Sequence, residues 1–178
     1  MSRLYTQPVS DATGAAAQLF AAIKGAVGKV PNAYATLGAN SPVALEIALQ
    51  MDGALRKSSL SAKDIEVIKL TVSQHAICDY CLAAHTLMGK KAGLSAETIK
   101  AVRHGQPSGD ARIDALALFV HTIVNTSGTV PAEVVDAVRA AGVSDAQIAD
   151  TTLAIASITL TNLFNRINDT VLDFPAAD

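Results

Sequence analysis

Residues 60–85 read LSAKDIEVIKLTVSQHAICDYCLAAH, and the pattern is helical from its first residues. Ser61 follows the apolar Leu60 and precedes a segment with helical spacing of its apolar residues, so it has the position of a helix N-cap. Asp64 stands three residues after Ser61, which is the spacing of a capping box. We therefore expect a helix to begin immediately after Ser61.

Other segments repeat this start, and strand-like alternation is nearly absent. A serine N-cap follows an apolar residue in 94–99 and again in 143–148, and Ser41-Pro42 places proline at a first helical position. The further helices that we expect cover about 11–27, 31–37, 41–57, 110–126, 131–141 and 144–171. The sequence thus predicts an all-α fold, a helical bundle.

Length and composition favour one globular domain. The chain has 178 residues, of which 17% are charged and 50% hydrophobic. No Pro/Ser-rich linker divides it, so we expect a single domain over residues 1–178. Such a composition makes disorder implausible. With 14 Lys and Arg against 16 Asp and Glu and no Trp, the chain is not expected to bind nucleic acid.

The long uncharged runs do not have the character of membrane spans. Residues 115–132 and 151–165 are interrupted by polar residues or glycine, and residues 1–10 contain no apolar segment of a secretory signal. We therefore expect no membrane association and a cytoplasmic location, where thiols stay reduced. The expected last helix is apolar on more than one side, which favours a homo-oligomer.

Residues 78–85 read CDYCLAAH and combine two thiols with an imidazole. On a helix that turns about 100° per residue, Cys81 lies about 60° from Cys78 and His85 about 20° from it. The three side chains then share one face. Two thiols in adjacent turns at a helix N-terminus can close a disulfide, and the amides there stabilise a thiolate. His85 is placed to exchange a proton with a thiolate.

Glu66 precedes Cys78 by 12 residues, which is about 18 Å on one unbroken helix. It can approach the thiols only if the chain turns between about His75 and Cys78 and two helices cross there. No glycine or proline marks this turn, so the sequence indicates the break only weakly. His75 beside the turn and Tyr80 between the cysteines are candidates to surround the pair.

Each of these residues also has an interpretation without chemistry. Two cysteines on a helix can be buried small apolar groups. A single histidine on an Ala-rich helix can be a structural, hydrogen-bonded residue. Glu66 can be a solvated residue beside Lys63 and Lys69. The joint pattern is harder to explain in this way than any one of its members.

A metal site is a further alternative. Cys78, Cys81 and His85 could supply three zinc ligands, with Glu66 or His75 as the fourth. Structural zinc sites usually place a second ligand pair with its own short spacing on another element, and the sequence contains no such pair. The pattern therefore favours redox chemistry over zinc.

The spacing Glu66–x11–Cys78–x2–Cys81–x3–His85 resembles the signature of alkyl hydroperoxidase D and its relatives in the carboxymuconolactone decarboxylase superfamily. The flanking text that agrees is VPNAY (30–34), SP (41–42) and LTNLFNR (160–166). The chain is similar to the peroxidase-related branch over about residues 30–174, which is most of its length.

The resemblance implies an all-helical protein assembled as trimers or hexamers, without a cofactor or a metal. It makes Cys78 and Cys81 the redox pair, His85 the proton-relay histidine and Glu66 the carboxylate base, acting through water. Alkyl hydroperoxidase D has a second histidine directly before its second cysteine, where this chain has Tyr80. The decarboxylases of the superfamily lack the cysteine pair, so the lactone reaction is disfavoured.

The expected activity is reduction of a hydroperoxide by the cysteine pair. One thiolate attacks the O–O bond and becomes a sulfenic acid, and the other cysteine condenses with it to a disulfide. An external dithiol, of the lipoyl or thioredoxin type, then reduces the pair. The helix terminus favours Cys78 as the attacking residue and the spacing to His85 favours Cys81. We expect Cys81 to attack and Cys78 to resolve.

Two rival functions use the same residues. One is a non-catalytic oligomeric module whose cysteines sense oxidation or hold zinc, and the other is a thiol–disulfide exchanger that does not react with peroxide.

Asn165, Arg166 and Asp169 form a polar cluster at the end of the expected last helix. We expect these three residues to make hydrogen bonds between helices or between subunits.

Overall fold

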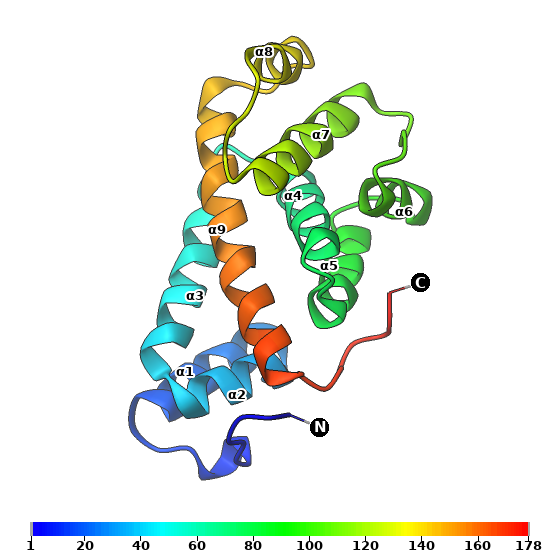
Figure 1. The fold of residues 1–178 in the computed structure, drawn as a ribbon. Helices are drawn as coiled ribbons and strands as arrows, with labels where there is room; N and C mark the ends of the chain where they lie inside the picture. Colours follow the sequence, from blue (N-terminus) through cyan, green and yellow to red (C-terminus); the bar gives the residue numbers. More distant parts are fainter. Residues whose placement is uncertain (1, 178) are drawn as a thin grey trace.

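The computed structural model describes residues 2–177, and every regular element among them is helical. The elements are the 3-10 turn η1 (Val9–Asp11) and the helices α1 (Gly14–Val27), α2 (Asn32–Asn40), α3 (Pro42–Leu55), α4 (Ala62–His75), α5 (Asp79–Lys91), α6 (Ala96–His104), α7 (Ala111–Thr126), α8 (Ala132–Ala140) and α9 (Asp145–Asn168). The all-α prediction is confirmed (Figure 1).

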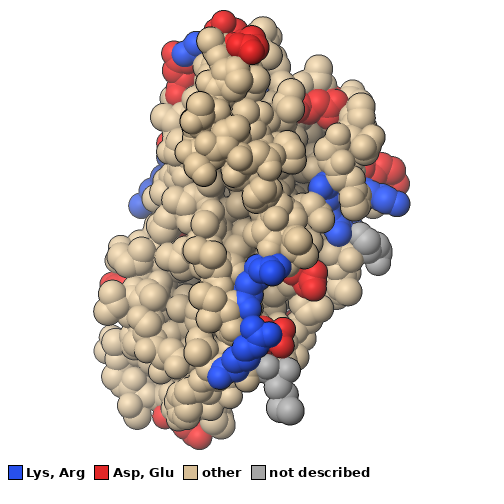
Figure 2. All heavy atoms as spheres, viewed as in Figure 1, with Lys and Arg blue, Asp and Glu red and all other residues tan. Residues whose placement is uncertain are grey.

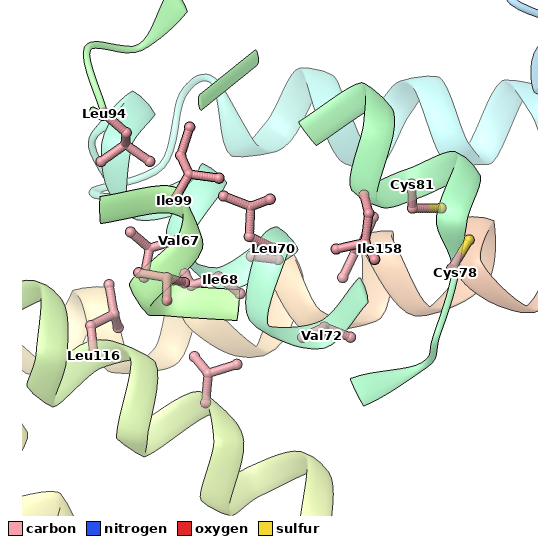
Figure 3. Close-up of a cluster of buried hydrophobic side chains, with 14 of the residues drawn as sticks. Val67, Ile68, Leu70, Val72, Cys78, Cys81, Leu94, Ile99, Leu116 and Ile158 are labelled. Carbon is pink, nitrogen blue, oxygen red and sulfur yellow. The ribbon is translucent and has the colours of Figure 1, made fainter. Parts of the chain in front are cut away.

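Helix α4 is the central element and packs against α5, α7 and α9. Its side chains Val67, Ile68 and Leu70 are fully buried, and Figure 3 shows them in one cluster with residues of the surrounding helices. The polar residues of α4 are buried too, and these are Asp64, Glu66, Lys69, Thr71 and Ser73. Because buried polar groups need partners, four of them bond to groups on other helices, while Thr71 donates to the Val67 carbonyl within α4.

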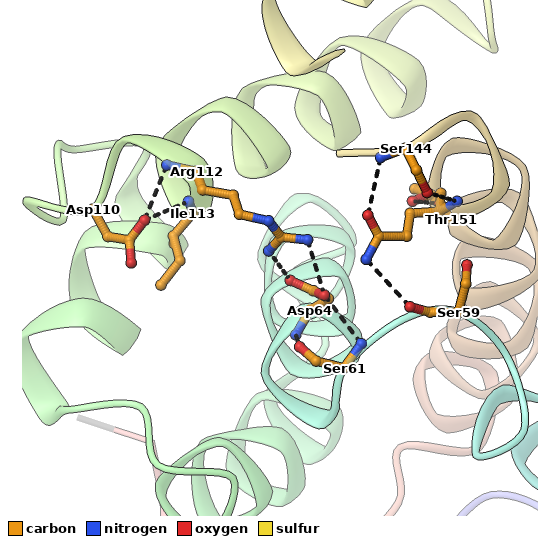
Figure 4. A network of polar contacts seen from close by, with 9 residues as sticks. Ser59, Ser61, Asp64, Asp110, Arg112, Ile113, Ser144 and Thr151 are labelled. Carbon is orange, nitrogen blue, oxygen red and sulfur yellow. Dashed lines mark hydrogen bonds and ion pairs between the residues drawn. The ribbon is translucent and has the colours of Figure 1, made fainter. Parts of the chain in front are cut away.

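The start of α4 shows how local and distant contacts combine (Figure 4). Ser61 accepts from the backbone of Asp64 at 3.1 Å, and the Asp64 carboxylate accepts from the Ser61 backbone at 3.0 Å. The predicted capping box is therefore confirmed. The same carboxylate forms a two-pronged ion pair with Arg112 of α7. Asp64 thus both caps α4 and fastens α7 to it.

The serine N-caps predicted at 41, 95 and 144 are confirmed, but three predicted bounds are wrong by three residues: the first helix begins at Gly14 and not at 11, the second ends at Asn40 and not at 37, and the last ends before residue 171. Ser41, Ser95 and Ser144 each accept a backbone N–H of the first helical turn. The last helix ends at Asn168 and does not reach residue 171. Asp169 takes a left-handed conformation with φ 53°, and the next N–H bonds back to the Asn165 carbonyl, which closes the helix.

Helix α9 packs against α3 and α4, as its apolar composition predicts, but its surface is not fully covered. Leu163 and Ile167, one turn apart on α9, are 59% and 62% exposed. Figure 2 shows a face on which uncharged residues form most of the surface. Within residues 2–177, no helix has the length and apolar character that crossing a bilayer requires.

Candidate active site

The turn between α4 and α5 lies where the sequence marks it only weakly. Ile77 has φ 51°, a left-handed conformation that is unusual for a β-branched residue. The N–H of Ile77 bonds to the Gln74 carbonyl and that of Cys78 to the Ser73 carbonyl, which is a Schellman motif with isoleucine in the place of glycine. Arg166 of α9 donates to the Ile77 carbonyl. A contact with a residue distant in the sequence therefore stabilises a turn that lacks the usual glycine.

This turn folds α5 back so that Glu66 meets His85. The Oε2 atom of Glu66 lies 2.8 Å from Nδ1 of His85, and both side chains are largely buried. Because Glu66 is an acceptor when ionised, Nδ1 carries the hydrogen and Nε2 stays available for another partner. The expected crossing of the two helices is confirmed, and the solvated interpretation of Glu66 is wrong.

Cys78 is the N-cap of α5 and is 2% exposed, and both cysteines are free thiols. The pKa of Cys78 is lowered, chiefly because the Cys81 thiol donates a hydrogen bond to its sulfur. The Cys81 backbone N–H and the charge of Arg166 act in the same direction, while burial opposes them. Cys78 therefore carries the negative charge more readily than an ordinary cysteine.

Cys81, 3% exposed, has the opposite tendency. Its pKa is raised because its proton is held in the hydrogen bond to Cys78, and burial and the Cys78 charge add to this. Figure 3 shows the two sulfur atoms next to each other at the edge of the apolar cluster. The electrostatics thus favour Cys78 as the more acidic thiol of the pair, whereas the spacing to His85 favours Cys81 as the attacking residue.

The hydrogen bonds of the Tyr80 hydroxyl are made to groups other than the two cysteines. Its hydroxyl donates to Asp173 at 2.6 Å and accepts from the Ala33 N–H at 3.2 Å, and its ring packs edge-on against Phe174. Burial first, and then Asp173, raise the pKa of this phenol well above its usual range. Tyr80 is therefore a neutral group that fastens the start of α5 to α2 and to the C-terminal segment.

His75 is exposed and lines a cleft of about 500 Å³ between α4, α7 and α9. Asn162 and Arg166 also line this cleft, but neither cysteine does. The structure thus pairs Glu66 with His85 and Cys78 with Cys81 at the α4–α5 crossing, and it leaves His75 outside both pairs. Within residues 2–177 there is also no group of three His, Cys, Asp or Glu side chains arranged to hold a metal ion.

One residue that touches the pair was not anticipated there. The side-chain amide of Asn165, on α9, donates to the Cys81 sulfur at 3.4 Å. The sequence indicates hydrogen bonding between helices for this residue, which is confirmed, but it does not indicate the partner, which lies 84 residues away. The signal that the sequence offered for this contact was an asparagine on a helix expected to be apolar on more than one side.

A buried charged network lies beside the site and was also not predicted. Asp52 of α3 accepts from Lys69 at 2.7 Å, from Tyr34 at 3.1 Å and from Ser157 at 3.1 Å. Burial raises the pKa of Asp52, but Lys69 and then Ser157 outweigh it, and His85 contributes in the same direction. The network joins α2, α3, α4 and α9 around the end of the site that holds His85.

The comparisons with known proteins concern the family and the fold. The sequence model of the carboxymuconolactone decarboxylase family matches residues 42–120, which include Glu66 and residues 78–85. A search of curated proteins finds no match to the chain.

Solved structures share the fold. A peroxidase-related protein with an alkylhydroperoxidase AhpD core, from Ralstonia eutropha, has 20% identity and a TM-score of 0.84 over 97% of this chain and 92% of its own. A protein of unknown function from Agrobacterium tumefaciens, linked to antioxidant defence as an AhpD, has 25% identity and a TM-score of 0.66 over 75% and 92%. The debrominase Bmp8 in complex with 2,3,4-tribromopyrrole, crystallised as a cysteine-to-alanine variant, has 15% identity and a TM-score of 0.77 over 97% and 92%.

Proposed function

We propose that this chain, which belongs to the alkyl hydroperoxidase D-like proteins of the carboxymuconolactone decarboxylase superfamily, reduces hydroperoxides with the Cys78–Cys81 pair. The observation that supports this most is the contact between Glu66 and His85, because the α4–α5 turn places a carboxylate–imidazole pair on the elements that carry the thiols. Buried adjacent thiols next to a proton-transfer pair are what a dithiol–disulfide cycle requires.

In the first step the Cys78 thiolate attacks the terminal oxygen of the hydroperoxide. The O–O bond breaks, Cys78 becomes a sulfenic acid, and the alkoxide leaves with a proton as an alcohol. The lowered pKa of Cys78 supports this order, which reverses the expectation drawn from the spacing between Cys81 and His85. His85, held by Glu66, supplies the proton.

In the second step Cys81 attacks the Cys78 sulfenic acid. A sulfur–sulfur bond forms, the sulfur–oxygen bond of the sulfenic acid breaks, and the Cys81 proton passes through the His85–Glu66 pair to the leaving hydroxide, which departs as water. An external dithiol then attacks the disulfide and is itself oxidised, which restores both thiols. The sum is one hydroperoxide and one external dithiol converted to an alcohol, water and a new disulfide.

We also propose that the working form is a homo-oligomer, a trimer or hexamer. Leu163 and Ile167 of α9 and Ile77 of the α4–α5 turn are large apolar side chains with more than half of their surface exposed. Such side chains are commonly covered in an assembly. Light scattering with size-exclusion chromatography gives the mass, and a monomer at micromolar concentration would contradict the proposal.

The decisive experiment is a thiol count by intact mass after one equivalent of cumene hydroperoxide is added to the fully reduced protein. We expect both thiols to disappear within seconds as one internal disulfide, and added dihydrolipoamide to restore them. Thiols that persist for hours would exclude peroxidase function. Rapid oxidation by lipoamide alone would instead identify a disulfide exchanger, and bromide release from 2,3,4-tribromopyrrole would identify a reaction like that of Bmp8.

The order of attack is tested with single variants and a sulfenic acid probe. In Cys81→Ser the serine hydroxyl can still donate to the Cys78 sulfur, so we expect rapid formation of a stable sulfenic acid. In Cys78→Ser the remaining thiol is buried and lies away from the helix N-cap that stabilises a thiolate, so we expect it to react at least about tenfold more slowly. Faster reaction of Cys78→Ser would restore Cys81 as the attacking residue.

A further inference from the structure

Three asparagines on α9, spaced three residues apart, are all buried although the helix is otherwise largely apolar: Asn162, Asn165 and Asn168. The outer two have roles in packing. Asn162 accepts from the Ser73 hydroxyl at 3.2 Å. Asn168 accepts from the Leu4 backbone at 3.0 Å and donates to Thr170 at 2.9 Å. Only Asn165, the middle one, directs its amide at a cysteine.

The side chain of Asn165 is oriented for the sulfur and not for its own hydrogen-bonding needs. Its Nδ2 donates to Cys81 Sγ at 3.4 Å, while its Oδ1 is buried and has no partner among the described residues. Asn165 is only 4% exposed. A buried carbonyl without a donor is unfavourable, and Asn162 carries a similar cost at its unpartnered Nδ2, so what distinguishes Asn165 is the sulfur that its amide contacts.

We propose that Asn165 is a catalytic residue of the cysteine pair, whose side-chain amide holds the Cys81 sulfur as a thiolate while the disulfide forms and while it opens. This inference rests on the proposed dithiol–disulfide cycle and not on hydroperoxide as the oxidant. A neutral amide suits the task, because its N–H bonds strongly to an anionic sulfur and only weakly to a thiol or a disulfide.

The reductive half of the cycle shows where the amide acts. A thiolate of the external dithiol attacks Cys78 Sγ, a new sulfur–sulfur bond forms, and the Cys78–Cys81 bond breaks. Cys81 leaves with the electron pair and then takes a proton from the His85–Glu66 pair. The second thiol of the reductant then attacks the mixed disulfide, so that the reductant leaves as a disulfide and Cys78 is released.

A second polar group of α9 also affects the Cys81 thiol. The hydroxyl of Thr161 donates to the Ile158 carbonyl at 3.0 Å and lies close enough to Cys81 to lower the pKa of that thiol, as Asn165 also does. Asn165 and Thr161 are four residues apart and therefore on one face of α9. They oppose the effects of burial and of Cys78, which make ionisation of Cys81 difficult.

The test uses a Cys78→Ser background, in which Cys81 is the one remaining thiol, and measures its alkylation by iodoacetamide between pH 7 and pH 9. Asn165→Asp keeps the volume and removes the donors, and Asn165→Ala is the second variant. Asn162→Ala is the matched control, since it truncates a buried asparagine one turn away that does not contact sulfur. Circular dichroism checks that each variant is folded.

We expect Asn165→Asp and Asn165→Ala to slow alkylation at a given pH at least fivefold, although the alanine variant opens space around Cys81. Asn162→Ala should stay within twofold. In the protein with both cysteines, dithiothreitol should open the disulfide of each Asn165 variant at least threefold more slowly. Unchanged alkylation in a folded Asn165 variant, or an equal loss in Asn162→Ala, would overturn the proposal.

The assay contains no hydroperoxide, so its outcome is independent of the proposed peroxidase activity. A protein that fails to react with peroxide can still show the Asn165 effect on Cys81. Conversely, an active peroxidase whose Asn165 variants alkylate normally would retain the proposed function and lose this inference. The two failures are therefore distinguishable.

Discussion

Oε2 of Glu66 lies 2.8 Å from Nδ1 of His85, across the crossing of α4 and α5. The two residues are 19 positions apart, and the contact exists only because the chain reverses direction at Ile77. The carboxylate fixes which ring nitrogen carries the hydrogen and stabilises the imidazolium that forms when His85 takes a proton. In the proposed cycle, proton transfer at the cysteines therefore depends on a residue that does not itself contact sulfur.

Glu66→Gln should slow disulfide formation by a hydroperoxide. The amide can still accept a hydrogen bond from His85, but it no longer stabilises a positive imidazole. We expect a loss on the order of 10- to 100-fold, which is below the range of about 100- to 10,000-fold for general acid–base catalysis because His85 itself remains in place. Stopped-flow measurement of thiol loss provides the rate. Glu46→Gln, at an exposed position of α3, is the control, and equal rates for the two variants would contradict the assignment.

Lys69→Met should destabilise the protein by about 3 kcal/mol, because it leaves the partly buried Asp52 carboxylate without its cation. Urea unfolding provides the free energy of unfolding. The double variant Asp52→Asn/Lys69→Met should recover at least half of the loss, since it removes both charges. Lys100→Met on exposed α6 should change stability by less than about 0.5 kcal/mol. A single variant as stable as this control would show that the network is dispensable.

Ile77→Gly should stabilise the protein. Isoleucine at φ 51° is strained by about 1–2 kcal/mol, and glycine removes the strain at an entropic cost of about 0.5–1 kcal/mol. The net gain is then about 0.5–1 kcal/mol. Ala76→Gly, next to it in right-handed conformation, carries the entropic cost without the relief and should be destabilised. Thermal melts of both variants check this, and an equal loss in both would contradict strain at Ile77.

Asp64 should make the protein sensitive to acid. Burial raises the pKa of its carboxyl, but the hydrogen bonds from Arg112 and Ser61 outweigh this, and the folded pKa lies below the ordinary 3.8. The unfolded chain therefore binds more protons in acid. The stabilisation is complete above the unfolded pKa and is lost as the pH falls through the folded value.

The variant Asp64→Asn should accordingly be less stable than the parent protein at pH 7 and depend less on pH between 5 and 3. Urea unfolding at pH 7, 5, 4 and 3 measures both effects. A variant whose stability falls as steeply as that of the parent in this interval would show that Asp64 does not contribute to the acid sensitivity.

The helix starts were predictable because cap chemistry is local. Ser61 and Asp64 are three residues apart, so one short segment contains both partners of the capping box. The last helix was predicted three residues too long because no local sequence signal marks its end. Apolar residues continue to Val171 and Leu172, and the end is set by the left-handed Asp169, a residue type that the pattern does not mark.

The α4–α5 turn was inferred because Glu66 can approach the thiols only if the chain reverses there, and not because the sequence contains turn residues. The sequence contains no glycine at this point, and Ile77 is held by backbone bonds and by Arg166, which lies 89 positions away. No local pattern reports such a contact. The same holds for Asn165 and Cys81, and for the charges of Asp52 and Lys69, which meet only when α3 and α4 pack together.

The sequence by itself determined the helical class, the positions of most caps and the four residues of the spacing Glu66–Cys78–Cys81–His85, because these depend on neighbours a few residues apart or on a linear pattern. The tertiary structure decided which sulfur is the more acidic, where the amide of Asn165 points and that Tyr80 lies outside the relay. Acidity and hydrogen bonding depend on burial and on groups from α2, α3, α4 and α9 that converge in space. The residue spacing within one segment does not predict which groups from other helices will lie beside it.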